Sequence, residues 1–344
     1  MPTGALSRHR GGDADGTSPA DGTCQVLDGR GDSTLMTTNA TIQFHLGAPQ
    51  VSGPLAVYPI FGPEPRLLYR GLPQAVQHGA FVTEVDAWGD VNEVLVCNAS
   101  DQAVLLYEGE LIAGARQNRT IDQPVLIPIG AEVRVPVSCI EHGRWDASRH
   151  ADRFTVAGHT PDPELRRTKR ATANRRAATG QSTRPDQAEV WEEIDARLEL
   201  HAVAAPSRAF TDLFAAKRPA LDQLKQPICA LSGQLGAIAT IAGEPVALDL
   251  VSRPEVFADL LPRLADGYAL QALRLEYTID APPPAEADGA AGQFLEQVLR
   301  SRPRRIETRG MGDAFVPMRR GIPGCGVRVD RELVALSAFP AKVR

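Results

Sequence analysis

The stretch Tyr107–Trp145, YEGELIAGARQNRTIDQPVLIPIGAEVRVPVSCIEHGRW, decides the fold of this chain. Its apolar runs ELIAGA, PVLIPIG and AEVRVPVSC are short and rich in branched residues, and turn-forming residues separate them, which is typical of β-strands. The spacing between the runs leaves no room for crossover helices, so the strands are expected to pair antiparallel. The stretch therefore predicts an antiparallel β-rich core, built as a sandwich or a partial barrel.

The pattern on either side of this stretch adds further strands and then helices. The earlier runs LAVYPIFG, AFVTEV and VNEVLVCN are also strand-like, and GQLGAIATIAGEPVALDLV predicts a buried hairpin that turns near Gly243. Helix-start signals follow at Asp186, Pro206 and Ser252, each ahead of apolar residues at helical spacing. The predicted class is α+β, with several helices from the C-terminal half.

Composition divides the chain into six parts. Residues 1–40 are rich in Gly, Asp, Ser and Thr and predict a disordered tail, whereas APPPAEADGAAG at 281–292 predicts a linker. No acidic residue lies between Glu164 and Asp186, which predicts a solvated basic connection. The expected order is tail (1–40), β-rich region with the candidate site (41–150), exposed basic connection (151–185), α+β region with helices and the hairpin (186–280), linker (281–292), and a C-terminal helix with strands packing on the same fold (293–344).

Bulk composition excludes several classes of protein. The 344 residues are 43% hydrophobic, enough for a sizeable core, and the net charge of −5 argues against a generally basic nucleic-acid binder. No apolar run is long enough to predict a transmembrane helix. The five cysteines are scattered and form no CxxC pair, so we expect no disulfide framework, no zinc site and a reducing cytoplasm.

Two acidic residues, Glu108 and Glu110, flank Gly109 at the start of the stretch. They could act as a general acid and base, bind a metal, or lie at a solvated hairpin tip. No histidine lies beside them at metal-ligand spacing, so a metal site is not predicted.

The run Arg116-Gln117-Asn118-Arg119 places two guanidinium groups and two amides in one loop or strand end. Guanidinium groups and amides satisfy phosphates, ribose hydroxyls and base edges well, and Arg does so with two parallel hydrogen bonds. The run therefore marks a candidate ligand-binding segment, with an exposed polar turn as the alternative.

The alternation along 131–139 places Cys139 on the core side of its strand, together with Val135 and Val137. A buried free cysteine usually behaves as a small apolar residue, so a structural role is favoured over a nucleophilic one. Glu141 continues onto the same side and needs a cation, either Arg119 or Arg144. Such a pair could fix the strand register, or the carboxylate could do acid–base work at a pocket mouth.

Several segments together resemble the ARPP domain family, named for its association with ADP-ribosylglycohydrolases and rhodanese-phosphatase proteins. The resemblance covers about residues 55–340 and rests on EGELIAGARQNR, PVSCIEHGRW, DQAEVW, GQLGAIATIAGEPVALDL and LVALSAFP. It implies no established activity. The polar family positions that it implies are Glu108, Glu110, Gln117, Asn118, Arg119, Cys139, Glu141, Arg144, Trp145, Gln187, Trp191 and Gln234.

The leading functional hypothesis is an accessory protein that binds a nucleotide-like or phosphorylated ligand in ADP-ribose, NAD or RNA-end metabolism. Arg119 and Arg144 would meet negative charge, Gln117 and Asn118 polar edges, and Trp145 would wall the pocket. Gln187 and Gln234 complete the expected ligand-binding set. One alternative is a hydrolase or transferase that uses Glu108, Glu110 or Glu141. Another is a scaffold for ADP-ribose or RNA-processing enzymes. The sequence names no cofactor.

Overall fold

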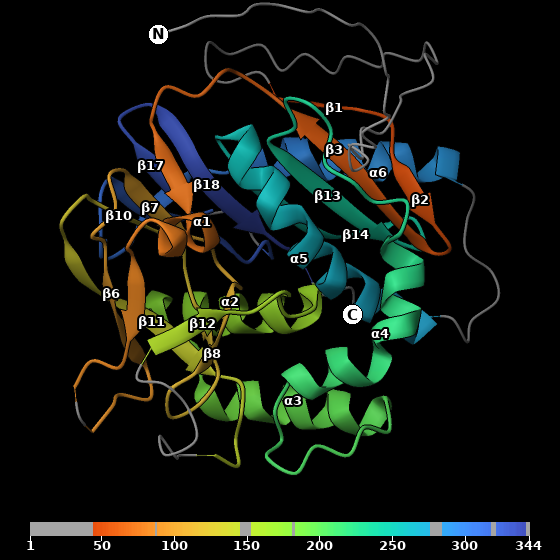
Figure 1. Ribbon diagram of the computed structural model, residues 1–344. Coiled ribbons are helices and arrows are strands. Elements are labelled where there is room, and N and C mark those ends of the chain that lie inside the picture. The colour runs from red at the N-terminus through yellow and green to blue at the C-terminus, as the bar shows by residue number, and fades with distance from the viewer. Residues whose placement is uncertain are drawn as a thin grey trace, which may run out of the picture. The chain divides into compact units, whose positions relative to one another are not determined.

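The computed structural model describes residues 44–86, 88–144, 153–180, 183–275, 284–317 and 321–341, all of which belong to one compact unit, Gly31–Arg344. The tail predicted over residues 1–40 lies outside the described residues, as does Trp145. The fold of the described part is α+β with an antiparallel β-rich core, which confirms the predicted class (Figure 1).

A nine-stranded sheet is the largest of the three β structures in the described part of this unit. Its strand order is β1-β3-β13-β14-β18-β17-β16-β15, and β2 pairs with the same edge of β3 as β1. The strands span β1 His45–Leu46, β2 Gln50–Ser52, β3 Leu55–Phe61, β13 Gly236–Ile241, β14 Glu244–Val251, β15 Pro303–Arg305, β16 Asp313–Pro317, β17 Gly324–Val329 and β18 Glu332–Ala338.

The second β structure is a closed six-stranded barrel, where the sequence predicted a sandwich or a partial barrel. The barrel order is β11-β6-β5-β12-β8-β9, and a three-stranded sheet, β10-β7-β4, accompanies it. Of the strand pairs in the described part, β4 with β7 is parallel and the others are antiparallel. The strands span β4 Tyr69–Gly71, β5 Phe81–Thr83, β6 Glu93–Cys97, β7 Ala103–Leu106, β8 Leu111–Gly114, β9 Arg119–Ile121, β10 Val125–Ile127, β11 Glu132–Cys139 and β12 Arg153–Val156.

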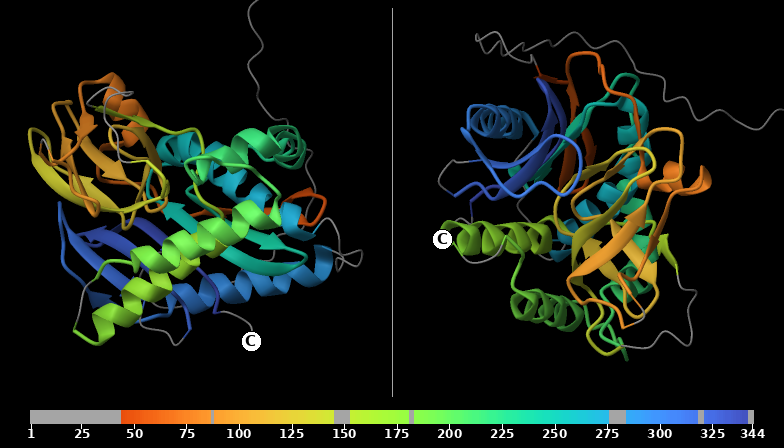
Figure 2. Two further views of the ribbon diagram at one scale, coloured as in Figure 1. Left: turned by 90° about the horizontal axis from the view of Figure 1, so that it is seen from below. Right: turned by 90° about the vertical axis from the view of Figure 1, so that its left-hand side faces the viewer.

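Helices cover both faces of the nine-stranded sheet (Figure 2). Apolar residues of α6 pack on one face of the sheet, and apolar residues of α5 pack on the other. The alternation of β3 shows the division, because Val57 belongs to the α5 side and Tyr58 to the α6 side. The helices span α1 Leu72–Gln77, α2 Pro163–Ala178, α3 Gln187–Leu200, α4 Thr211–Lys225, α5 Pro254–Ala272 and α6 Pro284–Leu299.

The region predicted as an exposed basic connection, residues 151–185, instead contains β12 and the 16-residue helix α2. Arg166, Lys169 and Arg170 on α2 are each at most 1% exposed. This part of the prediction is wrong because the carboxylates that neutralise these cations come from distant segments. Composition within the run itself gives no sign of them.

The linker predicted at residues 281–292 is also different in the structure. Helix α6 begins at Pro284, a residue type that the first turn of a helix tolerates, and continues through the alanines and glycines to Leu299. Ala291 and Phe294 of α6 are buried against the sheet, so packing overrides the weak local propensity. No helix among the described residues is long and apolar enough to cross a membrane.

Candidate functional site

Glu108 and Glu110 lie in the turn between β7 and β8, and both are buried rather than solvated. Their exposed fractions are 0% and 2%. Gly109 between them has φ +86°, and a Cβ atom there would lie 2.6 Å from Nε of Arg166. Glycine is therefore required both for the backbone conformation and for the close approach of the Arg166 guanidinium.

Arg166 joins the barrel to the sheet through two carboxylates. Its Nη2 lies 2.8 Å from Oε2 of Glu108 and 2.6 Å from Oδ1 of Asp249, and all three side chains are fully buried. The hydroxyls of Tyr107 and Tyr268 donate to Asp249 over 2.8 and 2.5 Å. Burial alone would lower the pKa of Arg166, but the two carboxylates outweigh burial and raise that pKa well above its ordinary value.

Glu110 also forms a hydrogen bond and an ion pair inside the protein. It accepts a hydrogen bond of 2.7 Å from the backbone N–H of Tyr107 and pairs with Arg263 of α5. Glu108 and Glu110 therefore form buried ion pairs that connect the turn between β7 and β8 to α2 and α5. Their acid–base role stays a prediction.

Glu141 pairs with Arg144, which is one of its two predicted partners. Nε and Nη2 of Arg144 donate to the two carboxylate oxygens over 2.9 and 2.7 Å, and the backbone N–H of Asn118 donates over 3.1 Å. Burial favours a higher pKa, but the hydrogen bonds from Arg144 and Asn118 lower the pKa of Glu141 below its ordinary value. Arg144 also donates to the carbonyl oxygen of Ala115 over 2.9 Å. The contacts connect the segment after β11 to the turn between β8 and β9, whereas the register-fixing and acid–base roles of the pair both stay predictions.

Gln117 and Arg119 are buried partners of one another, so the alternative of an exposed polar turn does not hold for them. Nη1 of Arg119 donates to Oε1 of Gln117 over 3.0 Å, and Nη2 lies 4.0 Å from Glu84. Asn118 is half-buried, and its Oδ1 accepts from the backbone N–H of Gly114 over 3.1 Å. These side chains hold the turn between β8 and β9.

Cys139 and Gln187 form a backbone clamp between β11 and α3. The Gln187 amide accepts from the Cys139 N–H and donates to the Cys139 carbonyl oxygen, both over 2.9 Å. Burial raises the pKa of the Cys139 thiol to about 11. Cys139 is therefore a protonated core residue at neutral pH, as the strand phase predicted.

Gln234 lies apart from these residues in the turn before β13. Its amide accepts from the N–H of Leu231 over 2.9 Å and donates to the carbonyl oxygen of Gly236 over 2.8 Å. Trp191 stacks on His142 at a centroid distance of 4.2 Å. Each of these side chains stabilises a local contact.

The structure brings Asn118, Glu141 and Arg144 together by hydrogen bonds. Two cavities in the described part have volumes of about 710 and 350 Å³, and no predicted site residue lines either of them. The smaller cavity lies beside the C-terminal end of α3. The larger cavity is the candidate functional site.

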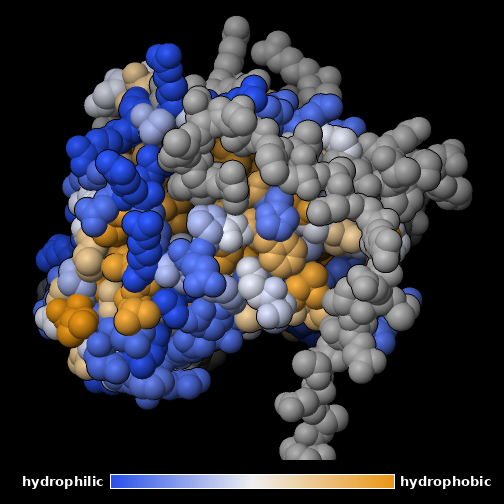
Figure 3. Space-filling view, turned by 90° about the horizontal axis from the view of Figure 1, so that it is seen from above, coloured by the Kyte–Doolittle hydropathy of each residue, from blue (hydrophilic) through white to orange (hydrophobic). Residues whose placement is uncertain are grey.

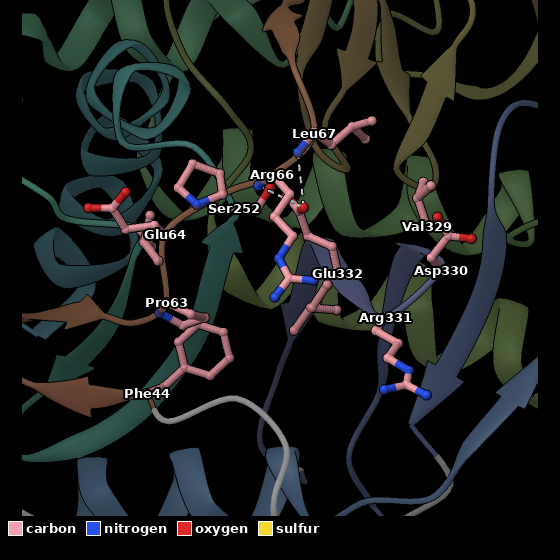
Figure 4. Close-up of a pocket in the computed structure, with 13 residues that line it drawn as sticks. Phe44, Pro63, Glu64, Arg66, Leu67, Ser252, Val329, Asp330, Arg331 and Glu332 are labelled. Carbon is pink, nitrogen blue, oxygen red and sulfur yellow. Dashed lines mark hydrogen bonds between the residues drawn. The ribbon is translucent and has the colours of Figure 1, made fainter.

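The larger cavity lies between the segment after β3, the start of α5 and the hairpin of β17 and β18 (Figure 4). Its walls come from five separate parts of the chain. The lining residues are Phe44, Pro63, Glu64, Pro65, Arg66, Leu67, Leu235, Ser252, Val329, Asp330, Arg331, Glu332 and Leu333.

Hydrogen bonds fix the walls of this cavity. Oε2 of Glu332 accepts from the backbone N–H groups of Arg66 and Leu67 over 2.9 and 3.0 Å, which ties the segment after β3 to the hairpin. Ser252 is hydrogen-bonded to the hydroxyl of Tyr69 at 3.0 Å, and burial raises the pKa of Tyr69 above its ordinary range. The cavity is therefore preformed.

The lining carries charges of both signs. Arg66 and Arg331 are exposed, and neither forms an ion pair with another described residue. Glu64, Asp330 and Glu332 supply three carboxylates. Such a lining offers hydrogen-bond donors and acceptors to one ligand.

No sequence pattern joins these residues. GPEPRL after β3 and VDRE in the last hairpin each read as an ordinary turn, and 266 residues separate Arg66 from Glu332. A dense polar run such as RQNR is visible in the sequence, whereas a cavity assembled from five segments leaves no local pattern. The Pro- and Gly-rich turn at residues 62–65 was the available signal, because binding residues often lie on loops.

On the face seen from above, apolar residues lie in groups among hydrophilic ones (Figure 3). Trp88 is the most exposed large apolar residue described, at 84%. Among the described residues, no group of three or more His, Cys, Asp or Glu side chains is placed to hold a metal ion.

A family model described as the ARG and Rhodanese-Phosphatase-superfamily-associated Protein domain, ARPP-1, matches residues 43–339. This range includes every residue that lines the larger cavity. No curated protein and no solved structure matches the chain.

Proposed function

The chain belongs to the ARPP-1 family, and from that premise we propose that it binds a nucleotide-like or phosphorylated small molecule as an accessory protein of ADP-ribose, NAD or RNA-end metabolism. The family description associates the domain with ARG and rhodanese-phosphatase proteins. Enzymes of those classes are the proposed partners. The buried cysteines Cys97, Cys139 and Cys325 are free thiols, which suits a cytoplasmic location.

The observation that carries the proposal is the cavity of about 710 Å³. Its volume falls within the range of roughly 300–1,000 Å³ that small-molecule sites occupy. A hydrogen-bonded wall, and guanidinium groups of Arg66 and Arg331 that form no ion pair with another described residue, favour a ligand over a purely structural void. The proposed site thus differs from the segment of densest polar sequence.

The lining suggests how a phosphorylated ligand would bind. The guanidinium groups of Arg66 and Arg331 would meet phosphate oxygens. The N-terminus of the 19-residue helix α5 begins directly after Ser252 and Arg253, and a helix N-terminus favours negative charge. Phe44 would offer an aromatic wall to a base.

Isothermal titration calorimetry with ADP-ribose, NAD and a 5′-phosphorylated oligoribonucleotide tests the proposal. We expect saturable binding of at least one ligand at one site, with Kd on the order of micromolar. Arg66→Ala and Arg331→Ala should each weaken binding about tenfold, because each removes a charged hydrogen bond.

The matched control is Arg300→Ala. Arg300 is 64% exposed and pairs with Glu296 on α6, and it does not line the cavity. Its replacement should leave the affinity unchanged. An absence of binding for all three ligands, or equal losses in all three variants, would overturn the proposal.

A further inference from the structure

Five consecutive residues, 63–67, line the cavity and form a strap along it (Figure 4). The strap connects β3 to β4 and contains neither helix nor strand. Pro63 and Pro65 have no backbone N–H, which leaves the strap few hydrogen-bond donors of its own. Among the described residues, the hydrogen bonds of the strap backbone are formed at Arg66 and Leu67. The position of the strap therefore depends on the side chains that hold these two residues.

Glu332 and Arg253 hold the backbone of Leu67 through its N–H and its carbonyl oxygen. Oε2 of Glu332, in the hairpin of β17 and β18, accepts from the N–H groups of Arg66 and Leu67 over 2.9 and 3.0 Å. Nη1 of Arg253, the residue before α5, donates to the carbonyl oxygen of Leu67 over 3.2 Å. Three hydrogen bonds from charged side chains thus fasten the strap to the hairpin and to the start of α5.

A single oxygen of Glu332 makes both of its contacts with the strap. The other oxygen, Oε1, is buried and has no hydrogen-bond partner among the described residues. One acceptor oxygen therefore suffices to hold the strap, and a neutral amide at this position would supply it. The negative charge of Glu332, in contrast, opposes a phosphate in the cavity. The hydrogen bonds and the charge of this side chain have opposite effects on an anionic ligand.

The clamp on Leu67 also determines where Arg66 leaves the strap. In Figure 4, the guanidinium of Arg66 extends from the strap toward the space between Phe44 and Arg331. A loop that is ordered before binding lowers the entropic cost of binding, and this raises the affinity without adding a contact to the ligand. Release of the strap would remove that advantage from Arg66.

We infer that Glu332 is a positioning residue of the proposed phosphate site, because it holds the strap through two backbone N–H groups so that Arg66 meets the ligand. The inference rests on the proposed function and assigns a carboxylate a favourable part in binding an anion. The effect is opposite in sign to the one that the charge of Glu332 alone predicts. Arg253 supports the same strap from the start of α5.

Calorimetry on two replacements of Glu332 separates its hydrogen bonds from its charge. The probe is whichever of ADP-ribose, NAD and the 5′-phosphorylated oligoribonucleotide binds the unmodified protein most tightly. Glu332→Ala removes both hydrogen bonds and should weaken binding about tenfold. Glu332→Gln removes the charge but keeps an acceptor oxygen, so the affinity should stay within about threefold of that of the unmodified protein or increase. The loss of charge alone would instead tighten binding in both variants.

A double-mutant cycle tests whether Glu332 acts through Arg66. In the Arg66→Ala background, Glu332→Ala should cause no further loss of affinity, because the strap no longer carries the guanidinium. Equal losses in the two backgrounds would overturn the inference. The control is Glu296→Ala, which removes a carboxylate of α6 that is 40% exposed and lies outside the cavity lining, and which should leave the affinity unchanged.

Hydrogen–deuterium exchange of the peptide that covers residues 63–67 tests the clamp in the absence of ligand. The N–H groups of Arg66 and Leu67 should exchange about tenfold faster in Glu332→Ala than in Glu332→Gln or the unmodified protein. If Glu332→Ala does not fold, Glu332→Asp takes its place, because it keeps the charge but shortens the side chain by one methylene group, and it should weaken binding as well.

The two experiments distinguish a failure of the inference from a failure of the proposed function. Unchanged exchange in Glu332→Ala, or tighter ligand binding by this variant, would overturn the inference while the proposed function stands. If none of the three ligands binds the unmodified protein, the proposed function itself fails, and the role of Glu332 in binding fails with it.

Discussion

Arg166 on α2 and Asp249 on β14 form a two-point ion pair, although 83 residues separate them in the chain. Nη1 of Arg166 lies 3.1 Å from Oδ2 of Asp249, and Nη2 lies 2.6 Å from Oδ1. Both side chains are fully buried, and Glu108 of the barrel completes the cluster. The contact fastens α2 between the barrel and the nine-stranded sheet, so the polar residues at Glu108 serve the fold.

Replacing Arg166 by methionine should destabilise the protein by about 3–5 kcal/mol, because it leaves the carboxylates of Glu108 and Asp249 buried without their cation. Urea denaturation followed by circular dichroism measures the change in unfolding free energy. Arg175→Ala on the same helix is the control, since Arg175 is 64% exposed and its pair with Glu189 contributes less than about 1 kcal/mol. Equal losses in the two variants would contradict the account.

Replacing Gln187 by alanine should cost about 1–3 kcal/mol, because it removes both hydrogen bonds to the backbone of Cys139. Denaturant titration gives the loss. Gln223→Ala on α4 is the matched control, because Gln223 is exposed and should change stability by less than about 0.5 kcal/mol. If Gln187→Ala were as stable as the control, the clamp would have no structural role.

The Cys139 thiol should resist alkylation in the native protein. Burial raises its pKa to about 11, so the thiolate population is small at pH 7.5 and grows only as the pH approaches that value. Iodoacetamide labelling followed by peptide mass spectrometry should modify Cys139 far more slowly in the native protein than in the urea-denatured protein, because the native side chain is buried. Labelling of native Cys139 as fast as in the denatured protein at pH 7.5 would restore the nucleophile hypothesis.

Stability should fall as the pH drops from about 6.5 to about 4 through His159. Burial against Phe214, at a ring distance of 4.0 Å, lowers the pKa of His159 to about 4. The unfolded chain protonates this imidazole near pH 6.5, so it binds more protons than the folded chain within this window, and stability decreases. The stabilisation is complete above pH 6.5 and is lost as the pH falls through about 4, a change of about 3 kcal/mol.

His159→Phe keeps a ring against Phe214 and removes the titrating group. The pH dependence of unfolding between pH 6.5 and 4 should therefore be shallower in this variant by about one proton. A pH profile identical to that of the unmodified protein would show that His159 is not the group responsible.

The periodicity of the sequence predicted the features that depend on residues close together in the chain, such as which face of a strand is buried. The alternation of Val135, Val137 and Cys139 correctly assigned the thiol to the core, and Arg144 was one of two predicted partners of Glu141. Close strand spacing likewise predicted an antiparallel core, which became a closed barrel beside an open sheet.

Long-range pairing could not be predicted in the same way. Arg166 resembles a solvated residue because its neighbours Arg167 and Lys169 are also cationic, whereas its counter-charges come from Glu108 and Asp249. Dense polar sequence therefore marked a buried ionic network instead of an open pocket. The cavity shared by Arg66 and Arg331 escaped detection because its walls meet only in the folded chain.

A crystal structure of the full chain with ADP-ribose tests the central claim most directly. We predict electron density for the ligand in the 710 Å³ cavity, with its phosphates at Arg66 and Arg331. Density at Glu141 and Arg144 instead, or an empty cavity at a ligand concentration that saturates binding in solution, would contradict the claim.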